Sequence, residues 1–180
     1  VENLVNSTSI AEVGAGANVV AGKIIGKAIN STNMSSDTSG STGGVVSAAG
    51  VDSVTRIALT TRMIVGASAN LRTVGFSSNE RNFVLEAMNI VNAKDHVVFK
   101  TGGALSGAGA DSTIETTTDL AKVEIGNNAV LSSVSALELS ARGQGIVNIS
   151  VNVETYGAGT VTVGTALAKI LPTNEVFVGT

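Results

Sequence analysis

The sequence has no cysteine or tryptophan, and it contains few aromatic, proline or charged residues. Without cysteine, it cannot form disulfides, thiolate metal sites or cysteine nucleophiles. Aromatic residues make up 3% of its 180 residues, which leaves little material for an aromatic-lined ligand pocket. Charged residues make up 14% and the net charge is −3, which argues against a nucleic-acid-binding surface or a polybasic membrane surface.

Small and β-branched residues dominate the chain, and 43% of its residues are hydrophobic. β-Branched residues favour strands, so we expect an all-β chain with a thin, closely spaced core. No apolar run approaches the roughly 18 residues of a membrane helix, and no signal-peptide pattern is present. Because the sequence begins at Val1, we expect a processed chain or part of a longer one.

An internal repeat is visible in two glycine-rich segments. Residues 43–53 and 102–112 align without a gap and are identical at seven of eleven positions. The other four positions exchange only small or apolar residues. Such a repeat is typical of a solenoid, in which each unit buries its apolar residues against its neighbours.

A second repeated element is centred on a glycine and recurs at intervals of roughly 50 to 60 residues, a period typical of repeat architectures. Apolar residues alternate before each glycine, which indicates a strand with one buried face, and the glycine indicates a bend or a bulge between two short strands. The pattern divides a single domain, 1–180, into three units of approximately 1–60, 61–120 and 121–180. The anchoring residues are Gly14, Gly66, Gly126 and Gly179.

We therefore predict a parallel β-helix with short loops. A unit of this length matches two or three coils of about 20 to 28 residues. Seven or eight such coils, stacked about 4.8 Å apart, would form a rod roughly 35 Å long. The expected strands are 45–46, 63–65, 83–85, 97–99, 123–125, 146–153, 161–163 and 176–178.

Three segments fit this scheme less well. Residues 30–44 are rich in Ser, Thr, Asn and Gly, and we expect a projecting loop there. Residues 79–95 and 166–171 are compatible with either a strand or a short helix, and the sequence leaves both alternatives open.

The repeats at 11–19, 43–53 and 122–131 resemble those of filamentous-haemagglutinin-like and leukotoxin-type bacterial surface adhesins. The resemblance implies a right-handed parallel β-helix at the cell surface, and hence an extracellular location. It also implies that host cells or neighbouring cells are the partners. The repeats of that family define no catalytic or binding residues, so the resemblance assigns no such role to any residue of this chain.

The residues themselves predict no catalytic, cofactor-binding or metal site. His96 is the only histidine, and a triad with Asp95 is disfavoured because neighbouring strand residues point to opposite faces. Asp52 and Asp111 lie in segments similar to calcium-binding glycine–aspartate repeats but lack the tandem spacing, so we expect each to cap a turn. Scattered glutamates, without aromatic residues for sugar stacking, are expected to be solvated: Glu115, Glu124, Glu138 and Glu154.

Four Asn-X-Ser/Thr sequons begin at Asn6, Asn30, Asn33 and Asn148. We expect three of them to lie in loops. They matter only if the source organism glycosylates its proteins.

Three functions fit these observations. The first is a structural or adhesin-like segment without catalysis. The second is a subunit that assembles end to end with copies of itself, because solenoid ends such as the strand at 176–178 expose unpaired backbone groups. The third is a carbohydrate-active β-helix, which needs a charged cluster on one face from Lys94, Lys100, Arg142, Glu86 and Glu138.

Overall fold

The computed structural model describes residues 1–75 and 82–180, and every regular element in these ranges is a β-strand. In these ranges, no helix of a length and hydrophobicity suited to crossing a membrane occurs. In chain order the strands are β1 (Glu2–Val13), β2 (Asn18–Ala21), β3 (Ile24–Gly43), β4 (Val46–Val65), β5 (Asn70–Thr73), β6 (Phe83–Gly102), β7 (Leu105–Ile125), β8 (Val130–Ser132), β9 (Leu137–Tyr156), β10 (Gly159–Lys169) and β11 (Thr173–Val178).

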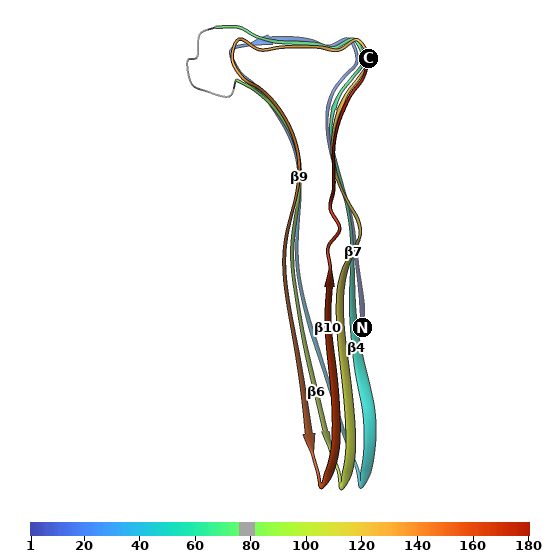
Figure 1. The fold of residues 1–180 in the computed structure, drawn as a ribbon. Coiled ribbons are helices and arrows are strands. Elements are labelled where there is room, and N and C mark those ends of the chain that lie inside the picture. Colours follow the sequence, from blue (N-terminus) through green and yellow to red (C-terminus); the bar gives the residue numbers. More distant parts are fainter. Residues whose placement is uncertain (76–81) are drawn as a thin grey trace.

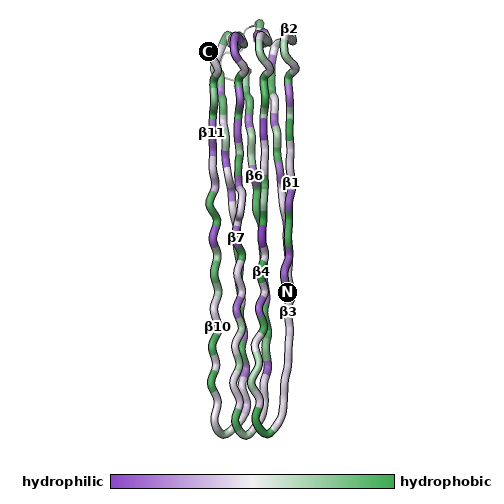
Figure 2. Tube along the Cα trace, turned by 90° about the vertical axis from the view of Figure 1, so that its right-hand side faces the viewer, coloured by the Kyte–Doolittle hydropathy of each residue, from purple (hydrophilic) through white to green (hydrophobic). Residues whose placement is uncertain are grey.

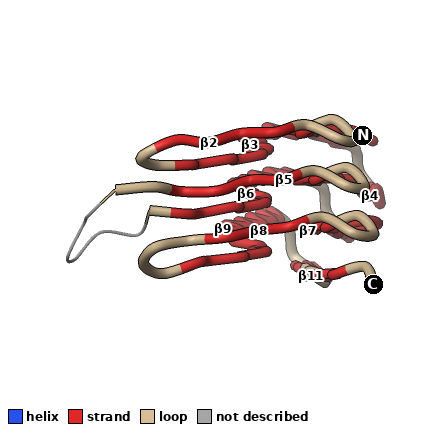
Figure 3. Tube along the Cα trace, turned by 90° about the horizontal axis from the view of Figure 1, so that it is seen from above, coloured by secondary structure: helices blue, strands red, loops and turns tan. Residues whose placement is uncertain are grey.

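The strands form three parallel sheets in which successive turns of the chain lie side by side (Figures 1 and 3). Sheet A has the order β1-β4-β7-β10, and β11 also pairs with β7. Sheet B has the order β2-β5-β8, and sheet C the order β3-β6-β9. One coil therefore consists of an A strand, a short B strand and a long C strand. This confirms the prediction of an all-β chain with stacked parallel strands, while the handedness of the coil stays a prediction.

Each repeat unit is one long coil, so the prediction of two or three short coils per unit is wrong. Glu2 lies opposite Val54 in the next A strand, and Ile24 lies opposite Phe83 in the next C strand, so one turn of the chain takes up a whole unit. The reason is strand length. Each C strand has 20 residues, which at about 3.3 Å per residue spans roughly 66 Å.

The molecule is elongated and flat, and its long dimension follows the strands (Figure 1). The four levels of sheet A span only about 14 Å between the outermost strand axes, at about 4.8 Å per step. The expected rod of seven or eight coils along the stack is therefore replaced by three wide coils. Sheets A and C lie close together over most of the length of the molecule and diverge at the end where sheet B joins them (Figure 1).

The connections between sheets B and C differ in length from coil to coil. They contain two residues (22–23), nine residues (74–82) and four residues (133–136). These differences largely account for the unequal spacing of the glycine anchors, because the strands on either side keep their register.

The segments that fitted the scheme poorly are strands. Residues 30–43, expected to be a loop, belong to β3 and pair along their whole length with β6. Where a helix was the alternative, residues 83–95 lie in β6 and 166–169 in β10, while 79–81 lie outside the described residues. Hydrogen bonding to the neighbouring coil overrides local propensity here, as tertiary context commonly does.

The predicted strands fall within strands of the structure, but the strands of the structure are much longer. For example, the alternating run 146–153 is the middle of β9, and 97–99 is a small part of β6. Only Val45 falls outside, one residue before β4. The alternation of apolar and polar residues correctly predicted which side chains share a strand face, but it did not locate the ends of the strands.

The interior holds three apolar clusters separated by buried polar residues, so hydropathy varies in short stretches along the strands (Figure 2). Along β6, the polar positions Asn89, Asp95 and Thr101 interrupt the otherwise apolar inward face. The first cluster, at the sheet B end, includes Val65, Leu71, Phe83 and Val123; the second includes Ile57, Val91 and Ile114; the third includes Val97, Phe99 and Ala110.

Glycines line both ends of the long strands, where the backbones of successive coils approach most closely. The amide of Gly126 donates to the carbonyl of Val65, at 2.7 Å, and a Cβ at Gly126 would lie 2.5 Å from the nitrogen of Ala67. At the tight turns, a Cβ on Gly103 would collide with the carbonyl oxygen of Gly44 in the preceding coil. Gly14, Gly66 and Gly126 each lie between two strands, as predicted. A Cβ at Gly66 or Gly126 would meet the backbone of the preceding coil, whereas Gly14, in the first coil, has no atom within 4 Å.

Replacing Gly126 with alanine should push adjacent coils apart and lower the free energy of unfolding by about 1–3 kcal/mol, the usual cost of overpacking. Thermal unfolding followed by circular dichroism measures the change. Gly109→Ala is the matched control, since a Cβ there has no atom within 4 Å. Equal destabilisation by the two substitutions would contradict this explanation.

Candidate functional site on the outer faces of the long sheets

Side chains along each long strand point alternately inward and outward, so outward residues of successive coils form rows across the sheets. In sheet A, Arg56 lies opposite Glu115, which in turn lies opposite Lys169. These rows are the places where functional groups from different coils meet.

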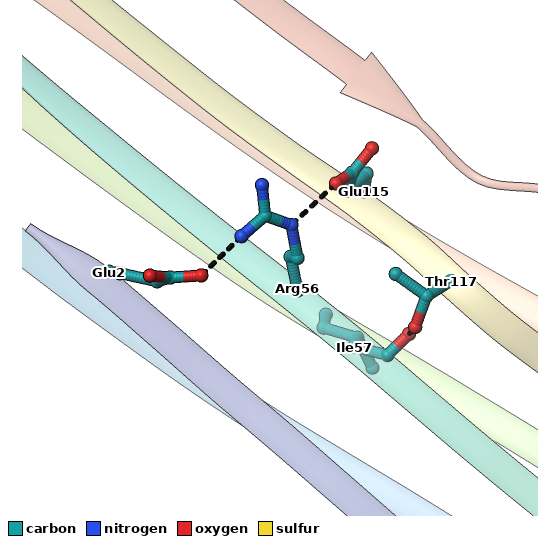
Figure 4. Close-up of polar contacts among 5 residues, drawn as sticks. All are labelled: Glu2, Arg56, Ile57, Glu115 and Thr117. Atoms are coloured by element: carbon teal, nitrogen blue, oxygen red, sulfur yellow. Dashed lines mark hydrogen bonds and ion pairs between the residues drawn. The ribbon is translucent and has the colours of Figure 1, made fainter.

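Arg56 bridges two carboxylates from the adjacent coils (Figure 4). Its Nε donates to Oε1 of Glu115 at 2.8 Å, and its Nη1 donates to Glu2. The hydrogen bond that Arg56 donates to Glu115, together with the charge of Glu2, raises the pKa of the Arg56 guanidinium. Beside this row the pairing of β4 with β7 shifts by one residue, and the hydroxyl of Thr117 donates to the carbonyl of Ile57 at 3.4 Å.

A second charged row lies near the sheet B end of sheet A. Glu124 accepts from Nε of Arg62 at 2.8 Å and pairs with Lys122 at 3.0 Å. Burial of the Glu124 carboxyl opposes its ionisation, but the hydrogen bonds from Arg62 and Lys122 outweigh that effect and lower its pKa. Lys122 also pairs with Glu175 at 3.4 Å and lies 5.7 Å from the ring centre of Phe177.

On sheet C, Glu86 is enclosed between two cations from the other coils. Lys27 Nζ lies 2.9 Å from its Oε2, and Arg142 pairs with its Oε1. Glu86 is only 3% exposed although it faces outward, because these two side chains cover it. The hydrogen bond from Lys27 lowers the pKa of Glu86; burial opposes this lowering, and Arg142 adds to it.

Two smaller polar contacts lie further along sheet C. Glu154 accepts from the hydroxyl of Tyr156 at 2.7 Å and pairs with Lys100 at 3.0 Å, and both contacts hold its pKa below the ordinary value. His96 Nδ1 lies 2.9 Å from Oδ1 of Asp37.

The five charged residues considered for a carbohydrate site all lie in β6 and β9 of sheet C, but they do not gather in one place. Glu86 and Arg142 form a pair, and Glu138 lies opposite Val84, near that pair. Lys94 and Lys100 lie further along β6, roughly 26 and 46 Å from Glu86 at about 3.3 Å per residue. This spacing gives no support to a single substrate groove.

His96 and Asp95 point to opposite sides of β6, as predicted. The His96 side chain is exposed on the outer face, whereas Asp95 is 2% exposed and lies inside the coil. Ser112 donates to Oδ2 of Asp95, and its Oδ1 has no hydrogen-bond partner. This buried carboxylate was not predicted, although the alternation of β6 places Asp95 on the same face as Ala93 and Val97.

Asp52 and Asp111 do not cap turns, so that prediction is wrong. They lie within β4 and β7 and face each other in register on the outer surface. The coils thus place two carboxylates side by side, a count below the several ligands that calcium needs. Among residues 1–75 and 82–180, no group of three or more His, Asp or Glu side chains is arranged to hold a metal ion.

A buried polar network crosses the coil interior at Asn89. Asn89 accepts a hydrogen bond from the hydroxyl of Thr61 and donates to Oδ1 of Asp119 at 2.7 Å. One coil earlier, Asn30 accepts from the hydroxyl of Ser7 at 3.0 Å and donates to its carbonyl at 3.0 Å. These side chains join sheets A and C through the core.

The sequons lie in strands, which corrects the expectation of loops. Asn6 is in β1, Asn30 and Asn33 are in β3, and Asn148 is in β9. Asn30 is 5% exposed and its amide is bonded to Ser7, so in the folded chain it is closed to glycosylation. The other three side chains are exposed on the outer faces.

Replacing Asn89 with alanine should leave Thr61 and Asp119 without their partner inside the core. We expect the free energy of unfolding to fall by about 2 kcal/mol or more, which is the cost of leaving buried polar groups without hydrogen-bond partners. Asn33→Ala, on the exposed face of β3, is the control, with an expected change of about 0.5 kcal/mol or less. Chemical denaturation of both variants gives the comparison, and similar losses would refute the structural role of Asn89.

Replacing Glu86 with glutamine should reduce stability in a pH-dependent way. Because its folded-state pKa is depressed, the ionised carboxyl stabilises the fold above its unfolded pKa of about 4.3, and this contribution is lost as the pH falls through the folded-state value. The stability difference between the native chain and Glu86→Gln should therefore be largest near pH 7 and shrink towards pH 3. Denaturation series at both pH values test this, and a difference that grows on acidification would contradict it.

Comparisons with family models, with curated proteins and with solved structures found no match to this chain. The resemblance of its repeats to bacterial surface adhesins therefore stays a prediction. Any function must be inferred from the stacked coils and the charged rows on their faces.

Proposed function

We propose that this chain is a structural segment of an extracellular, surface-exposed or secreted filamentous protein of the adhesin type, without catalytic activity. One observation carries the proposal. The long strands of sheet C stack in register along their whole length, and β4 and β7 of sheet A do so with one shift after Ile57, so the chain builds two extended outer faces. Such an architecture suits spacing and display, as in other solenoids.

The chemistry of the faces supports this role. Glu86, Glu124 and Glu154 all have pKa values lowered by hydrogen bonds from neighbouring side chains, whereas a general acid needs the opposite shift. A depression of about 510 Å³ at the tight-turn end of sheet A is lined by residues such as Val46, Leu105 and Val161 and has no titratable side chain in its lining. The extracellular location is supported by the resemblance of the repeats.

The shape follows from the proposal and can be measured. In dilute solution we expect a β-type circular dichroism spectrum and a radius of gyration of about 20 Å, set by strands roughly 66 Å long. A compact chain of this size would give about 16 Å. Small-angle X-ray scattering distinguishes the two, and the compact value would contradict an extended scaffold.

The location is tested separately. Antibodies raised against the purified chain should label intact source cells or their secreted material. Labelling that requires permeabilised cells would overturn the extracellular role.

A further inference from the structure

The turns that join sheet C to sheet A form one narrow, convex end of the molecule (Figures 1 and 2). Each turn leaves only two residues between its strands, at 44–45, 103–104 and 157–158. We call these turns, together with the strand residues that flank them, the turn edge. The chain around the turn edge is uncharged over three long stretches, which are residues 38–51, 101–110 and 155–168.

Large apolar side chains are exposed at the turn edge. Val45 lies in the first turn and is 79% exposed, and Leu105, directly after the second turn, is 57% exposed. Leu105 has β4 on one side and β10 on the other, so its exposure belongs to the outer face of sheet A. In β10, Val161 and Val163 are exposed on the same face. An apolar surface that several strands share in this way marks an interaction site.

Small residues hollow the sheet A side of the turn edge. Gly107 lies between Ala48 and Val161 in the neighbouring strands, so larger side chains stand beside a position that has none. The result is the depression of about 510 Å³. Along β7, the first charged residue that points outward is Asp111, which lies six residues beyond Leu105, roughly 20 Å at about 3.3 Å per residue.

The sheet C side of the turn edge presents polar groups much nearer the turns. The hydroxyl of Tyr156 donates to Glu154 at 2.7 Å, and Glu154 pairs with Lys100 at 3.0 Å. Lys100 lies two residues from the end of β6, roughly 7 Å. An apolar tip followed by tyrosine and lysine is the arrangement found at bilayer interfaces, where the ring and the ammonium group reach the lipid headgroups.

Backbone groups of the turns bond to one another from coil to coil. The amide of Gly44 donates to the carbonyl of Gly102 at 3.1 Å, that of Gly103 to Tyr156 at 2.9 Å, and that of Leu105 to Val45 at 3.1 Å. Backbone groups without partners are the main cost of moving a chain from water into lipid. The bonds between successive turns lower this cost.

We propose that the turn edge binds a lipid surface by inserting its apolar side chains into one leaflet of a bilayer. Elements bound in this way enter the boundary between headgroups and acyl chains by about 5–10 Å. At that depth Val45 and Leu105 leave water, while Lys100 and Glu154 stay among the headgroups. The longer uncharged stretch on sheet A turns that face towards the bilayer.

The chemistry of the turn edge selects an electroneutral lipid surface rather than a protein. A protein partner gains specificity from complementary charges, and the three uncharged stretches offer none. A fluid bilayer closes around a convex apolar edge without needing such pairs. Anionic headgroups would require a cationic cluster, whereas Lys100, the cation nearest the turns, is paired with Glu154.

This partner deepens the proposed surface role and rests on the extended scaffold, which holds the turns together at one end. The purified chain should float with vesicles of phosphatidylcholine in a density gradient. Because the contact is apolar, binding should change little between low and high salt and should not require anionic lipid.

Paired substitutions locate the contact. L105D/V161D places two carboxylates in the turn edge and should lower the bound fraction by roughly tenfold or more, since the buried apolar area is lost. L4D/I10D is the matched control: Leu4 and Ile10 are also exposed on the outer face of sheet A but lie in β1, far from the turns. It should bind as the native chain does. Circular dichroism checks that both variants fold.

Single cysteines, in a chain that has none of its own, report the depth of each face without altering the apolar residues. Ala48 on sheet A and Ser41 on sheet C both lie three residues from the first turn and are exposed. An environment-sensitive fluorophore on A48C should shift to the blue with vesicles and be quenched by spin-labelled acyl chains. The same fluorophore on S41C should respond much less.

Several outcomes would overturn the proposal. They are absence of binding to phosphatidylcholine vesicles, equal losses in L105D/V161D and L4D/I10D, and binding that needs anionic lipid and disappears in salt. Self-association that L105D/V161D abolishes, without vesicle binding, would identify the partner as a second copy instead. The scaffold role stands in each case, because its shape and its location are measured independently.

Discussion

The whole structure depends on the hydrogen-bonded contact between one coil and the next. Parallel strands of adjacent coils lie about 4.8 Å apart, and this spacing must hold at the tight ends of the strands as well as along them. Gly66, Gly103 and Gly126 meet this constraint because a Cβ at any of them would collide with the backbone of the preceding coil. Once the ends are fixed, twenty-residue strands with modest sequence preference pair along their length.

The interior shows how register is specified in such long strands. If the interior were purely apolar, a strand could shift by two residues relative to its neighbour, because such a shift keeps every side chain on its original face. The buried Asn89 removes this freedom, because a slip would separate its side chain from Thr61 and Asp119 and leave buried polar groups without partners. We infer that the polar residues trade some stability for a unique alignment, a use of buried polar groups seen in other folds.

The repeat, the anchoring glycines and the strand faces could be predicted from the sequence because each leaves a local pattern. Coil size could not, since a unit of roughly 50 to 60 residues fits one wide coil or several narrow ones equally well. Residues 30–43 have too few apolar side chains to indicate a strand, and β3 exists because β6 supplies hydrogen bonds to it. The charged rows could not be predicted from the sequence either, because the pairing of Glu86 with Lys27 and Arg142 depends on the register between coils.

The connections between sheets B and C have a consequence for how such chains diversify. They change from two to nine to four residues while the strands beside them keep their pairing. Loop closure costs little more as a loop lengthens, so this corner can absorb insertions at small energetic cost. A protein built from these coils has, at one edge of each coil, a place where new sequence is acquired without rebuilding the scaffold. The same corner is the natural position for grafting a peptide or a domain.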